Sequence, residues 1–157
     1  MSSCPSPPSS ASSTRTQLSW ERALHEGLVR TLPRLQAAGV SLPYPDEFDE
    51  LPESDLDLRL STEERQAVHF PVAELLRELD WSEVKDEVGD PMDWFFLYDD
   101  LSDIYADVKE GFRLLDAGQP EAEAVWVWRD NFWAHWGYHN AGALKIVHYY
   151  VALNLGG

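Results

Sequence analysis

The chain of 157 residues has little cysteine and few basic residues. Cys4 is the single cysteine, which excludes an internal disulfide and a cysteine-based metal cluster. No apolar run precedes Cys4, so we expect neither a lipid-anchored nor a secreted precursor. Twelve lysines and arginines stand against 28 aspartates and glutamates, for a formal net charge of -16. A field of that sign repels phosphate backbones, so we expect no nucleic-acid partner.

Long apolar runs and the common catalytic motifs are also missing. No stretch approaches the roughly 20 apolar residues of a membrane helix, and the aromatic run near residues 125–132 is interrupted by Arg129 and Asp130. The sequence has no glycine-rich phosphate loop, no nucleophile elbow and no CxxC pair. We therefore predict a cytoplasmic protein without a membrane partner, and no serine or cysteine nucleophile.

The chain divides into a tail and one domain. Residues 1–16 are rich in serine and proline and have almost nothing to bury, which predicts disorder. Residues 17–157 contain the apolar residues and are predicted to form a single helical domain. Within it, residues 41–60 carry several prolines and a run of acidic residues without a basic counterpart, which is typical of a solvated loop. The oligomeric state does not follow from the sequence.

Hydrophobic periodicity predicts an all-α bundle of four to five helices, without strands. The first helix starts near Ser19, bends or ends at Pro33, and is followed by Gly39 just past its end. Ser61 and Glu64 form a capping box that starts the second helix. The third starts with Asp99 or Asp100 as N-cap and ends at residues 117–118, and the rest of the chain from Pro120 is helical. The residues predicted to be buried are Leu101, Tyr105, Val108, Phe112, Trp128, Phe132 and Leu144.

Two histidines lie one turn apart on the last predicted helix. His135 and His139 share a face with Trp128 and Phe132. Histidines at i and i+4 can bind one metal ion through their imidazole nitrogens if a carboxylate from another helix completes the site. The alternative is that both are core histidines, bonded to backbone carbonyls or carboxylates.

Four carboxylates form a stripe on the third predicted helix. Asp100, Asp103, Asp107 and Glu110 lie well away from the apolar face of that helix. A stripe of this kind normally faces water, and we expect the same here, with Arg129 as one partner for an aspartate. If the stripe turned toward the last helix instead, Asp103 or Asp107 would supply oxygen to a metal site with the two histidines.

Trp126 and Trp133 lie on the side of the last helix away from Trp128. If that helix is central, both tryptophans belong to the core, and this is the interpretation we favour. If it is peripheral, they form an exposed surface for a partner protein.

One set of residues in the second half of the chain forms a recognisable pattern: Asp99 to Tyr105, Asp107, Lys109 to Gly111, Gly118, Trp126, Trp128, Arg129, Phe132, His135 to Gly137, His139, Ala143, Leu144 and His148. This pattern resembles a bacterial family, domain-of-unknown-function family 5063, over about residues 18–150. The resemblance implies a compact helical domain and no activity, and it draws attention to Asp99, Asp103, Arg129, His135 and His139.

The net charge and the absence of a complete catalytic constellation favour a non-enzymatic protein-interaction module, adaptor-like or immunity-like. We expect such a module to bind a basic protein and to need no cofactor. The alternative is a metal-binding protein or metal-dependent hydrolase with a divalent ion. In that alternative His135, His139 and Asp103 or Asp107 hold the ion, and Arg129 holds an anionic substrate.

Overall fold

The computed structural model describes residues 27–44, 56–86 and 88–154. These form α2 (Val29–Ser41), α3 (Thr62–Arg77), α4 (Trp94–Asp116) and one long last helix. The last helix consists of α5 (Glu121–Asn131), a π-helical turn η2 (Phe132–Trp136) and α6 (Gly137–Asn154). In the described ranges there is no strand, only an isolated bridge between Lys85 and Pro91. The predicted all-α bundle is confirmed, whereas the tail, the helix start near Ser19 and most of the acidic loop lie outside the described residues.

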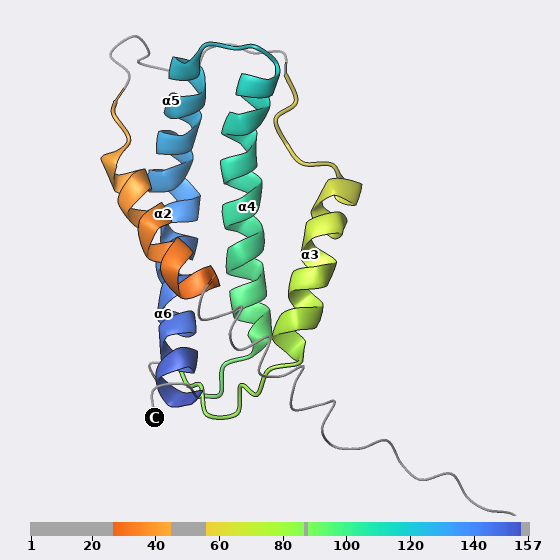
Figure 1. Ribbon diagram of the computed structural model, residues 1–157, viewed down its shortest axis with the longest axis vertical. Helices are drawn as coiled ribbons and strands as arrows, with labels where there is room; N and C mark the ends of the chain where they lie inside the picture. Colours follow the sequence, from red (N-terminus) through yellow and green to blue (C-terminus); the bar gives the residue numbers. More distant parts are fainter. Residues whose placement is uncertain (1–26, 45–55, 87, 155–157) are drawn as a thin grey trace, which may run out of the picture.

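Helix α4 lies at the centre of the bundle (Figure 1). Helix α3 packs on one side of it, and the long last helix runs along the other side in the opposite direction. The reversal takes place within a few residues at Gly118, whose φ of 76° suits glycine. The core fills the space between these helices, and its most deeply buried side chains are Leu76, Val84, Leu97, Leu114, Trp136, Val147 and Tyr150. No helix in the described ranges has both the length and the apolar character needed to cross a membrane.

Helix α4 starts earlier than the sequence predicted. Asp93, not Asp99 or Asp100, is the N-cap, and its Oδ1 accepts a hydrogen bond from the backbone N–H of Phe95 at 3.3 Å. The aromatic run from Trp94 to Tyr98 forms the first helical residues. Asp100 therefore lies inside the helix, where it cannot cap an end and needs another partner.

Helix α2 runs through Pro33 and Gly39 and ends at Ser41, so Gly39 does not follow its C-terminus as predicted. A Cβ at Gly39 would lie 2.3 Å from a ring carbon of Phe132 and 2.7 Å from one of Trp136. The glycine instead allows α2 to approach the aromatic residues of the π-helical turn closely.

The predicted buried face of α4 is only partly correct. Tyr105 and Phe112 are 36% and 46% exposed, and they line an apolar groove of about 270 Å³ between α4 and α2. The groove exists because α2 packs mainly against α6 and not against α4. Of the other residues predicted to be buried, Phe132 is buried, and those that are only partly buried are Leu101, Val108, Trp128 and Leu144.

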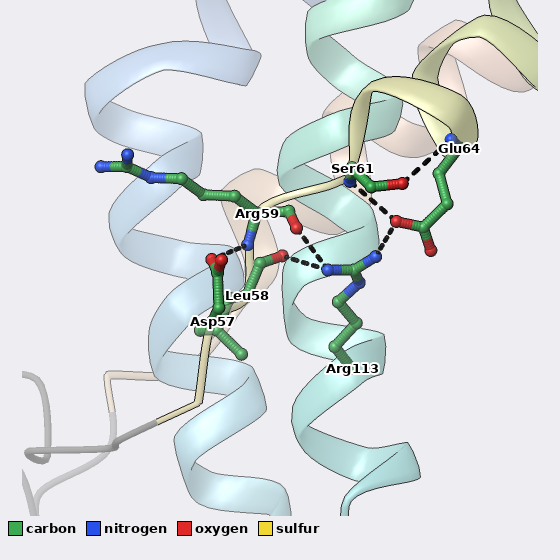
Figure 2. A network of polar contacts seen from close by, with 6 residues as sticks. All are labelled: Asp57, Leu58, Arg59, Ser61, Glu64 and Arg113. Carbon is green, nitrogen blue, oxygen red and sulfur yellow. Dashed lines mark hydrogen bonds and ion pairs between the residues drawn. The ribbon is translucent and has the colours of Figure 1, made fainter.

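The predicted capping box at the start of α3 is present and joined to α4. Ser61 Oγ accepts from the Glu64 N–H at 3.2 Å, and the Ser61 N–H donates to Glu64 Oε2 at 2.8 Å. Arg113, near the end of α4, donates to the same Glu64 carboxylate and to the backbone carbonyls of Leu58 and Arg59 (Figure 2). This network fastens the segment before α3 to α4.

Candidate metal site between α4 and the last helix

The carboxylate stripe of α4 faces the last helix, contrary to the expectation that it faces water. The side chains of Asp100 and Asp107 are each only 16% exposed, and both contact histidines of the last helix. The expectation was wrong because α4 is buried on more than one side. The carboxylate stripe contacts the last helix along α5, η2 and α6, while the apolar face of α4 lines a groove.

Each histidine is held by a carboxylate through Nδ1. His139 Nδ1 lies 2.7 Å from Asp100 Oδ1, and His135 Nδ1 lies 2.8 Å from Asp107 Oδ2. His139 Nε2 lies 3.5 Å from Asp103 Oδ2. The two imidazole rings lie 4.6 Å apart between centroids. One ligand atom from each of Asp103, His135 and His139 lies within 4.8 Å of the other two, which is close enough for one metal ion to contact all three.

One turn away, Asn131 Nδ2 donates to Glu110 Oε2 at 3.0 Å. Residues 131, 135 and 139 are thus spaced by four and face the stripe together. Four residues overshoot one turn of an α-helix, which has 3.6 residues. The π-helical turn, closed by an i→i+5 hydrogen bond, has more residues per turn than an α-helix, which removes the overshoot and keeps the side chains close to alignment. π-Helical turns occur frequently at functional sites.

Two glycines maintain this arrangement. The N–H of Gly137 donates to the Phe132 carbonyl five residues earlier, which closes the π-helical turn. A Cβ on Gly137 would lie 2.4 Å from that carbonyl oxygen. On α6, a Cβ on Gly142 would lie 2.9 Å from Asp100 Oδ2. One glycine therefore permits the wide turn, and the other leaves room for the carboxylate that holds His139.

The surroundings of Asp100 and Asp107 disfavour the ionised form of both carboxylates. Burial raises the pKa of Asp100, and the hydrogen bond from His139 opposes this only in part. Burial likewise raises the pKa of Asp107 against the effect of His135. The charges of Asp99 and Asp103 add to the rise for Asp100, and that of Asp103 adds to the rise for Asp107. Negative charge accumulates here, and a cation would relieve it.

The other residues singled out from the sequence lie elsewhere. Arg129 does not turn to the aspartates: it donates to the Leu42 carbonyl at 2.6 Å and lies over the Tyr44 ring at 5.3 Å. Trp133 is 64% exposed, so the expectation that it belongs to the core was wrong. Trp126 is partly buried and lines a pocket of about 150 Å³ with Trp133, Tyr44, Arg129 and Asp130.

Sequence reasoning placed Asp100 in the stripe but did not connect it to His139. It indicated bends or close helix contacts at Gly137 and Gly142 without relating them to the π-helical turn or to Asp100. The repetition of Asp103–Asp107 on one helix and His135–His139 on the other, both spaced by four, is a signal in the sequence that could have suggested pairing across two antiparallel helices.

The comparisons with known proteins identify a family. The family model described as a domain of unknown function, DUF5063, matches residues 17–153. The chain belongs to DUF5063. The resemblance found in the sequence is thereby confirmed, and the residues of the His/Asp cluster all lie within the DUF5063 match. No curated protein and no solved structure matches the chain.

Proposed function

We propose that this DUF5063 protein binds one divalent transition-metal ion through His135, His139 and Asp103. Asp100 and Asp107 would accept the Nδ1–H of the two imidazoles, and so direct each Nε2 toward the ion. Metal-bound histidines commonly donate their other ring N–H to a carboxylate in this way. The observation that carries the proposal is the convergence of the three ligand atoms to within 4.8 Å, with both Nδ1 atoms already paired.

The contacts of His139 give a second reason. A neutral imidazole has one N–H and one lone pair. If Nδ1–H is donated to Asp100, the lone pair of Nε2 faces the Asp103 carboxylate at 3.5 Å, so that two acceptors oppose each other. A metal ion between them removes this conflict. The competing explanation is an imidazolium that donates to both aspartates, and it needs no metal.

The ligand set indicates which ion and which chemistry. Imidazole and carboxylate suit zinc, iron and manganese, and two histidines with one carboxylate leave coordination positions free for water or substrate. The side chain of His135 is 48% exposed, which supports access from solvent. A bound water with a lowered pKa would then be the nucleophile of a metal-dependent hydrolase.

Elemental analysis of protein purified without chelator tests the proposal. We expect about one equivalent of zinc, iron or manganese. Variants His135→Ala and His139→Ala should lose the metal while circular dichroism remains helical. His148→Ala, an exposed histidine of α6 outside the cluster, is the matched control and should retain the metal. The same metal content in all four proteins would refute the assignment, as would no binding after zinc, manganese or iron is added.

A second candidate function rests on a different observation, the aromatic surface formed by the exposed side chains of Trp133 and Tyr44 together with the partly buried Trp126. Tryptophan is enriched among residues that dominate binding energy at protein interfaces. Together with the net charge of -16, this surface supports an adaptor-like role in binding a basic protein.

Affinity capture with the intact protein tests this second function. A basic partner should be captured, with binding that weakens as salt is raised. It should be lost in the double variant Trp126→Ala/Trp133→Ala and retained in His135→Ala. Equal capture by the tryptophan variant and the wild type would exclude this surface.

A further inference from the structure

The charges around the His/Asp cluster bear on what else could bind to the metal. Three aspartates, Asp100, Asp103 and Asp107, contact the two histidines. When ionised, they exceed the charge of one divalent cation by one negative charge. Glu110 lies in the next turn of the same stripe, and its carboxylate pairs with the uncharged amide of Asn131.

The arginines that α4 and α5 contribute, Arg113 and Arg129, have other partners. Arg129 is bound to the Leu42 carbonyl and covers the ring of Tyr44. Arg113, near the end of α4, is bound to Glu64 and to the backbone carbonyls of Leu58 and Arg59, which precede α3. Within the described ranges, the ion pairs of the three aspartates are made with His135 and His139 alone.

Sites that bind phosphates or carboxylates on a metal usually add arginine or lysine, because the anion brings charge that one ion does not neutralise. The cluster between α4 and the last helix has the opposite composition. An incoming anion would meet an excess of carboxylates in a partly buried setting, where charge repulsion is stronger than in water.

We infer that the open coordination positions of the ion take uncharged nitrogen or oxygen donors and disfavour phosphate and other anions. This inference rests on the proposed metal site and narrows its substrate class. An anionic substrate held by Arg129, the arrangement expected from the sequence, does not fit the position of that side chain.

Cobalt(II) is a suitable probe because its visible absorption changes when a ligand enters its coordination shell. The full-length protein, stripped of metal and loaded with one equivalent of Co²⁺, is titrated with imidazole and separately with inorganic phosphate at constant ionic strength. The same pair of titrations is made on Asp107→Asn, which removes one charge and retains an oxygen that can accept from His135.

We expect imidazole to change the wild-type spectrum and phosphate to do so only weakly. In Asp107→Asn the affinity for phosphate relative to imidazole should rise about tenfold, the effect of removing one nearby charge. Phosphate affinity that equals that of imidazole in the wild type, or a ratio that the variant leaves unchanged, would overturn the inference and leave the metal site intact. A cobalt spectrum that responds to neither ligand would overturn the inference by excluding open positions. Absence of any protein-bound cobalt spectrum would refute the metal site itself.

Discussion

Helix α4 takes part in two carboxylate networks with opposite electrostatics. Near its C-terminal end, Arg113 holds Glu64 and two backbone carbonyls, and this hydrogen bond lowers the pKa of Glu64 to about 2 (Figure 2). In the middle of the helix, Asp100 and Asp107 pair with histidines, and burial raises the pKa of both. The first network favours the ionised form of Glu64. In the second network, the ionised forms of Asp100 and Asp107 cost free energy.

In our proposal, the difference separates a network that supports the fold from one that supports a ligand. A paired and capped carboxylate such as Glu64 stabilises the folded state without any further component. Partly buried carboxylates whose pKa is raised weaken the folded state when they are ionised, and natural proteins retain such features mainly at functional sites. Each of the following predictions tests one side of this comparison.

The largest effect is expected from Gly137→Ala. In an ordinary helix, alanine is more favourable than glycine by about 1 kcal/mol. Here the new methyl group would clash with the Phe132 carbonyl, so we expect a loss of about 1–3 kcal/mol in the free energy of unfolding. Zinc affinity should fall as well, because the π-helical turn that aligns His135 is disturbed. Urea unfolding and zinc titration measure the two effects.

Gly27→Ala is the matched control, because nothing lies within 4 Å of a Cβ at that position. It should leave both quantities nearly unchanged. If Gly137→Ala instead proved as stable as the wild type, the wide turn would not require glycine.

The replacements Asp100→Asn and Asp107→Asn should have opposite effects on binding and stability. Loss of a carboxylate that orients a metal-bound histidine commonly lowers affinity about 10–100-fold. The metal-free variants should nevertheless be more stable than the wild type, by about 0.5–2 kcal/mol, because a buried charge is removed. Asp116→Asn, at an exposed position near the end of α4, should not change metal affinity. Destabilised metal-free variants would mean that the histidine pairs support the fold.

The same two aspartates predict how stability depends on pH in the presence of a chelator. Because their pKa values in the folded state are raised above the ordinary 3.8, the folded protein binds protons more readily than the unfolded chain. Relative to the Asp100→Asn/Asp107→Asn double variant, the wild type should therefore lose stability as pH rises from about 4 toward 7. Thermal unfolding of both proteins across this range measures the difference. A difference independent of pH would contradict the raised pKa values.

The smallest effect is expected from Glu64→Gln. Glutamine can still accept from the Ser61 N–H and complete the capping box, but it cannot form the ion pair with Arg113. Because the pKa of Glu64 is lowered from 4.5 to about 2, its contribution is present above pH 4.5 and is lost as pH falls toward 2. The urea midpoint of the variant should lie slightly below that of the wild type at neutral pH and coincide with it at the acidic end. If the two urea midpoints differed by the same amount at every pH, the loss of stability would come from the capping box and not from the ion pair.

The helical class and the Ser61–Glu64 start could be predicted because they depend on local patterns: apolar period and capping. The start of α4 could not be assigned from the sequence, because Asp93, Asp99 and Asp100 are all plausible caps. The helix begins after Asp93, where Trp94 and Tyr98 pack against the core. Gly39 was predicted to follow the end of the first helix because glycine is common at that position. Its role is instead close packing against Phe132.

The residues of the candidate site could be predicted from the sequence, but their convergence was only the alternative to a carboxylate stripe that faces water. The periodicity of α4 indicates one polar and one apolar face, but it does not say how many other helices pack against α4. A central helix with partners on several sides directs its carboxylates inward, and so Asp103 and Asp107 meet His135 and His139. The one-residue shift of the π-helical turn leaves no clear pattern in the sequence except Gly137.

The central claim is that His135, His139 and Asp103 form one metal site. Anomalous diffraction from crystals grown with zinc measures this directly. We predict one peak about 2.0–2.2 Å from Nε2 of both histidines and from an Asp103 carboxylate oxygen, with Asp100 and Asp107 still bound to the Nδ1 atoms. No peak at this position, with His139 donating to both Asp100 and Asp103, would contradict the claim and make the cluster a purely structural ion-pair network.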